Sequence, residues 1–283
     1  MATVYISPTG GAVTQDGTTA NTAYAFSSLS TAETDAQSGG KILFMDGTYS
    51  VTATLQLGAS NVTYEAVNLR KAVFDFANGG YGLELGRTAD SFAGFAMKGL
   101  VFDNLGAAGF NGAVDVEIAS SQLLTADDCD FLDMTSTYKA IVGSGAASNT
   151  GAMNATFTRC VFTGSKTTGD ANFFAYRGAN SHNLTLNNCT CIYTNNASSG
   201  IFKTGTIGSI TVKNSILLAD GSGTTTLGTA QTFTESNNCY RNISESADPA
   251  NNIIVDDPQF VDSPNGDYRL RPSSPCINAG TAS

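Results

Sequence analysis

The 283-residue chain has no tryptophan, one histidine and few charged side chains. Charged residues make up 13% of the sequence, and 14 basic against 24 acidic side chains give a net charge of −10. This composition excludes a long coiled coil, and the 41% of apolar residues argues against intrinsic disorder. The acidic balance also argues against nucleic acid as a partner, because such binding depends on Lys and Arg contacts to phosphate.

Long hydrophobic runs are also missing, since no segment reaches the roughly 18 apolar residues of a membrane span. The first seven residues have no basic and apolar leader pattern, so we expect no secretory signal and no membrane partner. No C-x-x-C pair occurs, and one histidine cannot complete a usual zinc set, so we expect no metal and no cofactor. The 35 Thr, 23 Asn and 30 Gly residues instead favour strands and turns.

Internal repeats are the most informative feature of the chain. Short segments align on a small or apolar residue that returns every 24 to 31 positions, at Leu100, Cys129, Cys160, Cys189, Ser215 and Cys239. A second set follows two positions later, at Phe102, Phe131, Phe162, Cys191 and Leu217. Residues two apart on a strand share a face. The pattern therefore predicts a solenoid in which each coil contributes one such strand and buries it by stacking on its neighbours.

A polar residue precedes most of these aligned positions. The set comprises Asp128, Arg159, Asn188, Asn214 and Asn238. Each Asn alone is typical of a turn, but three at one register favour a ladder of amides at a turn that recurs in successive coils.

Three stretches of sequence resemble the right-handed parallel β-helix, or pectate-lyase-like, superfamily, and most of all its phage tailspike and virion-surface members. They are Gly40 to Tyr49, the repeating N-C-x-F-like segments, and the tail from Asp257 to Gly280. The resemblance implies one all-β domain, a single-stranded right-handed parallel β-helix with a short N-terminal capping helix and an irregular C-terminal cap. We expect a leading segment and cap over residues 1–40, coils over 41–247 and the C-terminal cap over 248–283. The best helix candidate spans Ser28 to Gln37, with Gly39 and Gly40 behind it.

A catalytic site is harder to find in the sequence. A lyase of this superfamily needs a basic residue to remove a proton, for which Lys139, Arg159 and Arg177 are the candidates. A glycosidase needs two carboxyl groups on one face, and Asp128 and Asp130 would face outward from one strand. No cluster or matching motif supports either set, so we interpret these residues as solvated charges and predict no catalytic residue.

The function we predict is therefore a non-enzymatic phage virion surface protein, a tailspike, adhesin or capsid decoration. It would be assembled in the host cytoplasm and would bind host surface polysaccharide or other virion proteins. The alternative is a polysaccharide lyase or glycoside hydrolase that acts on an acidic polysaccharide, and whether the chain is an enzyme stays open. Small neutral residues outside the core, at Thr156, Thr158, Thr190, Ser209 and Thr211, favour lateral packing into a homotrimer. We expect the six cysteines to be free thiols.

Overall fold

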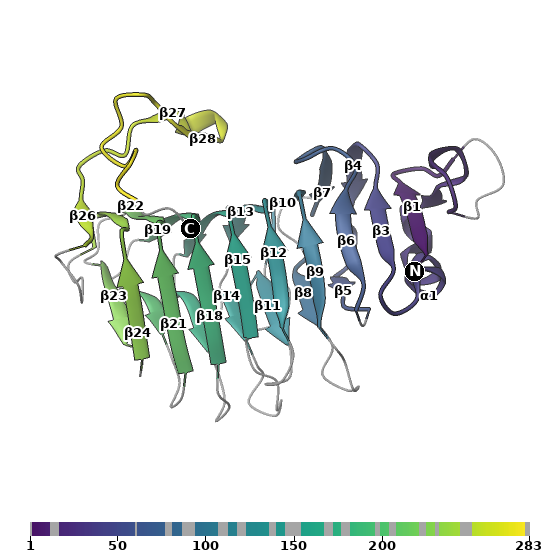
Figure 1. Cartoon of the computed structure of the whole chain (residues 1–283), viewed down its shortest axis with the longest axis horizontal. Coiled ribbons are helices and arrows are strands. Elements are labelled where there is room, and N and C mark those ends of the chain that lie inside the picture. Colours follow the sequence, from purple (N-terminus) through teal and green to yellow (C-terminus); the bar gives the residue numbers. More distant parts are fainter. Residues whose placement is uncertain are drawn as a thin grey trace.

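In the computed structural model, the chain winds into a solenoid of three long parallel sheets, with its C-terminal tail folded back over one of them (Figure 1). The structure describes residues 2–11, 17–59, 61–76, 81–86, 94–106, 113–117, 123–135, 140–144, 154–166, 172–176, 182–195, 199–203, 208–220, 225–229, 232–243 and 251–280.

Successive strands of the chain pass from one sheet to the next, and each strand pairs in parallel with the equivalent strand of the neighbouring coil. Sheet A has ten strands, in the order β2 (Tyr24–Ala25), β1 (Thr3–Ser7), β3 (Lys41–Phe44), β6 (Thr63–Ala66), β9 (Phe95–Lys98), β12 (Leu124–Asp127), β15 (Asn154–Thr158), β18 (His182–Asn187), β21 (Gly208–Lys213) and β24 (Thr232–Ser236). Sheet B has nine, in the order β4 (Gly47–Ser50), β7 (Ala72–Asp75), β10 (Leu100–Asp103), β13 (Asp130–Thr135), β16 (Val161–Lys166), β19 (Thr190–Asn195), β22 (Ile216–Asp220), β25 (Cys239–Arg241) and β26 (Ile253–Ile254). Sheet C has seven, in the order β5 (Leu55–Leu57), β8 (Leu83–Gly86), β11 (Val114–Glu117), β14 (Ala140–Ser144), β17 (Asn172–Tyr176), β20 (Ser199–Lys203) and β23 (Thr225–Thr229).

The core is held by side chains that repeat at one register from coil to coil. On sheet B, aromatic rings stack face to face with centroids 4.9 to 5.2 Å apart, through Tyr49, Phe74, Phe102, Phe131 and Phe162. The column continues through Cys191, Leu217 and Tyr240, which pair in register with it. All these side chains are buried. The predicted inward face is confirmed, because strands in register place equivalent residues about 4.8 Å apart, which suits stacked rings.

The second inward column confirms the repeat but corrects its last member. Asn238, and not Cys239, follows Ser215 in the column, because Cys239 pairs with Ile216. Asn238 is fully buried, and its Oδ1 accepts a hydrogen bond from the Ser215 N–H at 2.9 Å. Its own N–H donates to Asn252 Oδ1 at 2.9 Å. The alignment was one residue off here because a buried asparagine replaces the thiol, and an apolar pattern does not reveal such a residue.

The polar residue before this column makes the turn from sheet A to sheet B. It has a left-handed backbone, with φ between 50° and 58°, at Asp128, Arg159, Asn188, Asn214 and Asn237. Asn237 therefore takes the place that the sequence assigned to Asn238. Asparagine and aspartate tolerate this conformation better than most residues, which explains their recurrence. Asn237 Nδ2 donates a hydrogen bond to Ala279 O in the tail at 3.3 Å, so this side chain binds the C-terminal cap.

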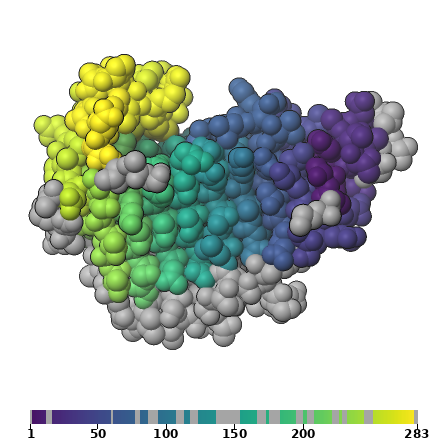
Figure 2. Space-filling model, viewed as in Figure 1, coloured from purple at the N-terminus to yellow at the C-terminus, as the bar shows by residue number. Residues whose placement is uncertain are grey.

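The two ends of the solenoid differ. At the N-terminal end, short 3-10 turns (η1, Ala20–Thr22, and η2, Phe26–Ser28) lead into helix α1 (Leu29–Ala36), which buries Ala32 and Ala36. At the other end, β27 (Phe260–Asp262), the turn η3 (Ser263–Asn265) and β28 (Asp267–Leu270) form an antiparallel hairpin. Figure 2 shows this tail as a lobe on the solenoid surface. In the described part of the chain, no helix is long and apolar enough to cross a membrane.

Candidate functional site

A groove of about 440 Å³ lies between the C-terminal hairpin and the solenoid, where sheet A turns into sheet B. Its solenoid side comes from three successive coils and from Arg70 of an earlier coil, and its other side comes from Gly266 and the start of β28. The lining residues are Arg70, Asp128, Asp130, Leu132, Arg159, Cys160, Val161, Asn188, Thr190, Gly266, Asp267, Tyr268 and Arg269.

Asp130, the first residue of β13, is the most buried charged group in the groove. It is 9% exposed, and its Oδ2 lies 2.8 Å from Arg70 Nε. Burial raises the pKa of this carboxyl to about 6, although the Arg70 charge opposes the shift. Its Oδ1 is buried and has no hydrogen-bond partner among the described residues. A ligand in the groove could supply that missing partner.

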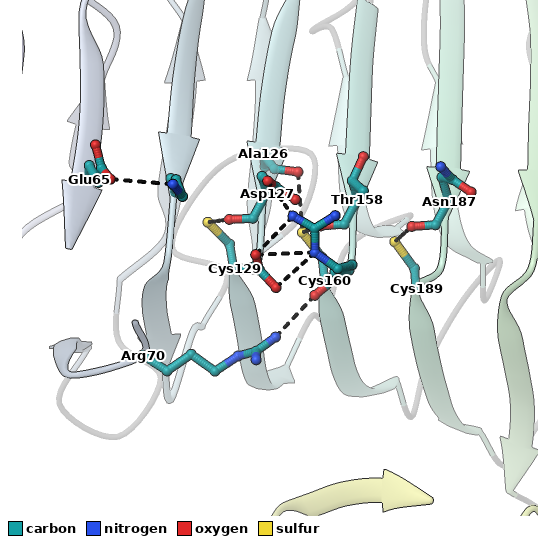
Figure 3. A network of polar contacts seen from close by, with 12 residues as sticks. Glu65, Arg70, Ala126, Asp127, Cys129, Thr158, Cys160, Asn187 and Cys189 are labelled. Carbon is teal, nitrogen blue, oxygen red and sulfur yellow. Dashed lines mark hydrogen bonds and ion pairs between the residues drawn. The ribbon is translucent and has the colours of Figure 1, made fainter. Parts of the chain in front are cut away.

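Arg70 comes from a coil nearer the N-terminus and reaches along the groove (Figure 3). Its Nη2 donates a hydrogen bond to Arg159 O at 3.0 Å. The coil between Arg70 and Asp128 has Gly99 at this turn, with φ 68°, and so carries no side chain there. The guanidinium thus fixes the backbone of the turn and the Asp130 carboxylate together.

Asp128 and Arg159 occupy the same turn position in adjacent coils. Arg159 Nε and Nη2 donate to the Asp128 carboxylate at 3.0 to 3.2 Å, and Nη2 also donates to Asp127 Oδ2 at 2.5 Å. These hydrogen bonds raise the pKa of Arg159, so its guanidinium stays charged at any ordinary pH. The arrangement presents a fixed guanidinium and a fixed carboxylate side by side.

The hairpin contributes Tyr268 and a third ion pair, in which Arg269 Nη2 lies 2.6 Å from Asp267 Oδ2. Burial raises the pKa of Tyr268, so its hydroxyl stays protonated. The Tyr268 ring packs edge-on against Phe260 of β27, with centroids 5.5 Å apart. This packing holds an aromatic ring and a hydroxyl at the wall of the groove.

A smaller cavity of about 200 Å³ adjoins the groove and shares Asn188, Thr190 and Tyr268 with it. One side of this cavity is formed by the turns from sheet A to sheet B, at Asn188, Asn214 and Asn237, and the other side is formed by the tail. Cys239 and Cys276 are among its lining residues. The two spaces follow the solenoid axis beneath the hairpin, so an extended ligand could occupy both.

The structure brings together three of the five candidate residues, Asp128, Asp130 and Arg159. Asp128 does not face outward from the strand with Asp130, as the sequence suggested, because it is the left-handed turn residue before β13. Lys139 and Arg177 lie outside the described residues. Thr190 is on sheet B and lines the groove, so it does not share a face with the Thr and Ser residues of sheet A.

Sequence reasoning missed Arg70 and the residues of the hairpin. The tail was expected to end the solenoid, but nothing in its sequence indicates that it returns over sheet B. Arg70 lies far from Asp130 in the sequence and outside the coils whose repeats were recognised. Arg70 also has a left-handed backbone, with φ 58°, but it stands one residue before the position of Asp128 and Arg159, because Lys71 is the residue that aligns with Gly99 and Asp128. No register in the sequence therefore links Arg70 to them.

No group of three or more His, Cys, Asp and Glu side chains that could hold a metal ion occurs among the described residues.

No protein-family model matches the chain, and no curated protein matches its sequence. Solved structures do match. Pectin methylesterase PemA from Erwinia chrysanthemi has a TM-score of 0.51 at 14% identity, over 86% of this chain and 80% of that one. Pectate lyase Pel9A has a TM-score of 0.39 at 13% identity, over 100% of this chain and 92% of that one. PfbA, a surface adhesin of Streptococcus pneumoniae, has a TM-score of 0.36 at 10% identity, over 88% and 83%.

At these identities the similarity defines the fold alone. With the three parallel sheets, it makes the chain a right-handed parallel β-helix protein whose structural neighbours are pectate-lyase-like, as the sequence predicted. Function has to be argued from the groove, because one fold carries many activities.

Proposed function

We propose that the chain binds a polysaccharide in the groove beneath its C-terminal hairpin and that it does so without cleaving it. The observation that carries the proposal is the groove itself, a space of about 440 Å³ lined by ion-paired donors and acceptors and by the aromatic ring of Tyr268. A concave site with a few convergent polar groups is typical of ligand binding. Sugars present many hydroxyl groups, which suit carboxylate and guanidinium partners held by neighbouring coils.

The charge balance of the groove favours a neutral or weakly charged glycan. The three guanidinium groups among the described lining residues are each paired with a carboxylate that also lines the groove: Arg70 with Asp130, Arg159 with Asp128 and Arg269 with Asp267. A polyuronate would meet little net positive charge there, and the chain as a whole carries −10. This balance argues against the acidic polysaccharide of the alternative hypothesis.

Elimination chemistry has weak support at this site. Among the described residues that line the groove there is no Lys and no His, and the arginines there are engaged in ion pairs. The protonated Tyr268 hydroxyl is a donor rather than a base.

The setting that we propose for the binding protein is a phage virion surface, where host polysaccharide is the partner. This part of the proposal rests on the resemblance of the sequence to phage tailspike and virion-surface proteins.

Binding is best tested on a panel of bacterial capsular and lipopolysaccharide glycans, with alginate and pectate as polyuronates, by calorimetry. Arg269→Ala should weaken binding by about tenfold, because it removes charge-assisted hydrogen bonds to the ligand. The matched control is Arg241→Ala, which removes an arginine that is likewise ion-paired, to Asp220 at 3.0 Å, but does not line the groove. Equal losses in the two variants, or no binding to any glycan, would contradict the proposal.

A second candidate is glycoside hydrolysis, which the raised pKa of Asp130 favours. A carboxyl with a pKa of about 6 can donate a proton, and the nearby Asp128 carboxylate could serve as its partner. The measurement is the release of reducing ends from the bound glycan between pH 4 and 8. Hydrolysis predicts turnover that falls above about pH 6 and disappears in Asp130→Asn while binding persists. Binding without any turnover favours the first proposal.

A further inference from the structure

Asp130 is an exception in the register that it occupies on sheet B. The equivalent positions on other strands hold Val101, Val161, Thr190 and Ile216, so the fold accepts an apolar or small side chain there. A buried ion pair is seldom more stabilising than well-packed apolar residues. The coil therefore does not need this carboxylate for its own stability, and yet the carboxylate lines the groove.

Two buried atoms of the Arg70–Asp130 pair have no hydrogen-bond partner among the described residues. They are Asp130 Oδ1 and Arg70 Nε. The nitrogen lies 2.8 Å from the other carboxylate oxygen, Oδ2, but this contact is an ion pair that lacks the alignment of a hydrogen bond. Buried polar groups in folded proteins are nearly always hydrogen-bonded, so a pair of such atoms in a groove indicates that a ligand completes them.

The two atoms need different partners. Arg70 Nε carries a hydrogen to donate, and Asp130 Oδ1 accepts, because a pKa of about 6 leaves the carboxyl largely ionised at pH 7.5. A hydroxyl group can serve both atoms, since it donates one hydrogen bond and accepts others. The two atoms belong to one ion pair and are therefore neighbours, as adjacent hydroxyl groups on a sugar ring are. One hydroxyl can accept from Nε while the next donates to Oδ1.

The charges around the pair disfavour other ligand groups. Arg70 already neutralises Asp130, and Asp128 and Arg159 form a second ion pair in the same groove. A uronate carboxylate would lie against the Asp130 charge, and an ammonium group would lie against the Arg70 charge. A hydroxyl that is acylated or methylated has lost the hydrogen that Oδ1 needs. A free hydroxyl is the group that fits.

We propose that Arg70 and Asp130 determine the specificity of the groove and select a neutral sugar residue by two adjacent free hydroxyl groups. This inference rests on the proposed glycan binding and names the part of the glycan that is recognised. Arg159, Tyr268 and Arg269 supply other contacts along the groove, so loss of the Asp130 contact weakens binding without abolishing it.

The test is calorimetry at pH 7.5 with dextran, mannan and pullulan as neutral probes, each before and after partial O-methylation. Methylation removes the hydroxyl donor and keeps the oxygen as an acceptor. With a polymer that binds the wild type, methylation and Asp130→Asn should each weaken binding by about tenfold, which is the loss of one hydrogen bond to a charged group. Because both changes remove the same contact, methylation should weaken binding to Asp130→Asn by less than about twofold.

The matched control is Glu65→Gln. It changes a carboxylate that is likewise ion-paired, to Lys41 at 2.5 Å, but that does not line the groove. This variant should bind each probe as the wild type does and should lose the same affinity when the probe is methylated. The methylation of the probe also tests the wild type directly, so that part of the experiment does not depend on how well any variant folds.

Unchanged wild-type binding after methylation, unchanged binding by Asp130→Asn, or equal losses on methylation in Asp130→Asn and the wild type would overturn the inference and leave glycan binding in place. Binding of the wild type to pectate, alginate or another glycan of the panel, but to none of the three neutral polymers, would do the same. No binding to any glycan would overturn the proposed function itself, so the two failures are distinguishable.

Discussion

Cys160 occupies a position in the inward column where a small donor is needed. Its Sγ donates to Ala126 O at 3.5 Å and to Thr158 O, two residues earlier, at 3.4 Å. Ser215 occupies the same register two coils on, and its Oγ donates to the carbonyl two residues earlier, Lys213 O, at 2.8 Å. A hydroxyl can therefore replace the thiol, but a carboxylate has no partner there.

We expect Cys160→Asp to lower the free energy of unfolding by more than about 3 kcal/mol, because it buries an unpaired charge. Cys160→Ser should lose less than about 1.5 kcal/mol, because the hydroxyl keeps the hydrogen bond. Denaturant titration of both variants provides the measurement. An unchanged midpoint for Cys160→Asp would contradict the inward placement of the column.

The raised pKa of Asp130 makes stability depend on pH. Its ordinary pKa is 3.8 and its folded pKa is about 6, so between these values the folded protein binds more protons than the unfolded chain. The free energy of unfolding should therefore fall as pH rises from about 4 to 6, by up to about 3 kcal/mol, and level off above. Asp130→Asn should lack this fall.

Burial also raises the pKa of Asp103, which therefore contributes to the pH dependence in the same direction in the wild type and in Asp130→Asn. The difference in the free energy of unfolding between these two proteins isolates the contribution of Asp130. Chemical denaturation at pH 4, 5, 6 and 7 gives that difference. Parallel curves for the two proteins would show that the Asp130 carboxyl is not shifted.

At the scale of elements, the turn between β9 and β10 differs from the turns that follow it. Gly99 has φ 68°, and a Cβ there would lie 3.0 Å from Leu69 Cδ1. Gly99→Ala should lower the free energy of unfolding by about 1–2 kcal/mol, since the left-handed backbone is unfavourable for alanine. Leu69 is 51% exposed, so Leu69→Ala alone should have little effect.

The double variant separates the two causes, because removal of the Leu69 side chain relieves the contact but not the backbone strain. We expect most of the loss to remain in the double variant, as measured by thermal or denaturant unfolding. Full recovery would mean that the side-chain contact, rather than the backbone conformation, limits this turn.

The coils could be predicted because Phe102, Phe131 and Phe162 recur at a spacing that only stacking explains. The tail could not be placed, because its hairpin packs on a surface that the repeats do not describe. The groove was found only in part for the same reason. Asp128 and Arg159 stand at one register of the repeat, which is visible in the sequence. Tyr268 lines the same groove only because the tail folds back over the solenoid, and the sequence does not show this.

At the scale of the whole molecule, the outward face of sheet A carries a regular row of small polar residues. Threonines lie in register across its later strands, at Thr125, Thr156, Thr185, Thr211 and Thr234. Ser209 and Thr158 lie on the same strands, β21 and β15. Such a face allows close lateral contact with few charges to neutralise, and we propose that it packs in a homotrimer.

Light scattering at micromolar concentration should give a mass three times that of the 29.2 kDa chain. Thr185→Lys should reduce this mass to that of the monomer, because it places a charge in the middle of the face. A wild-type mass equal to that of the monomer would contradict the proposal that the chain forms a trimer by itself.

The central claim is that the groove beneath the hairpin receives a glycan. The most direct measurement is hydrogen exchange of the protein with and without the polysaccharide that binds best in the panel. The account predicts slower exchange at the groove, in residues 128–132, 159–161, 188–190 and 266–269. Protection confined to the threonine face of sheet A, or none at the groove while the glycan is bound, would contradict it.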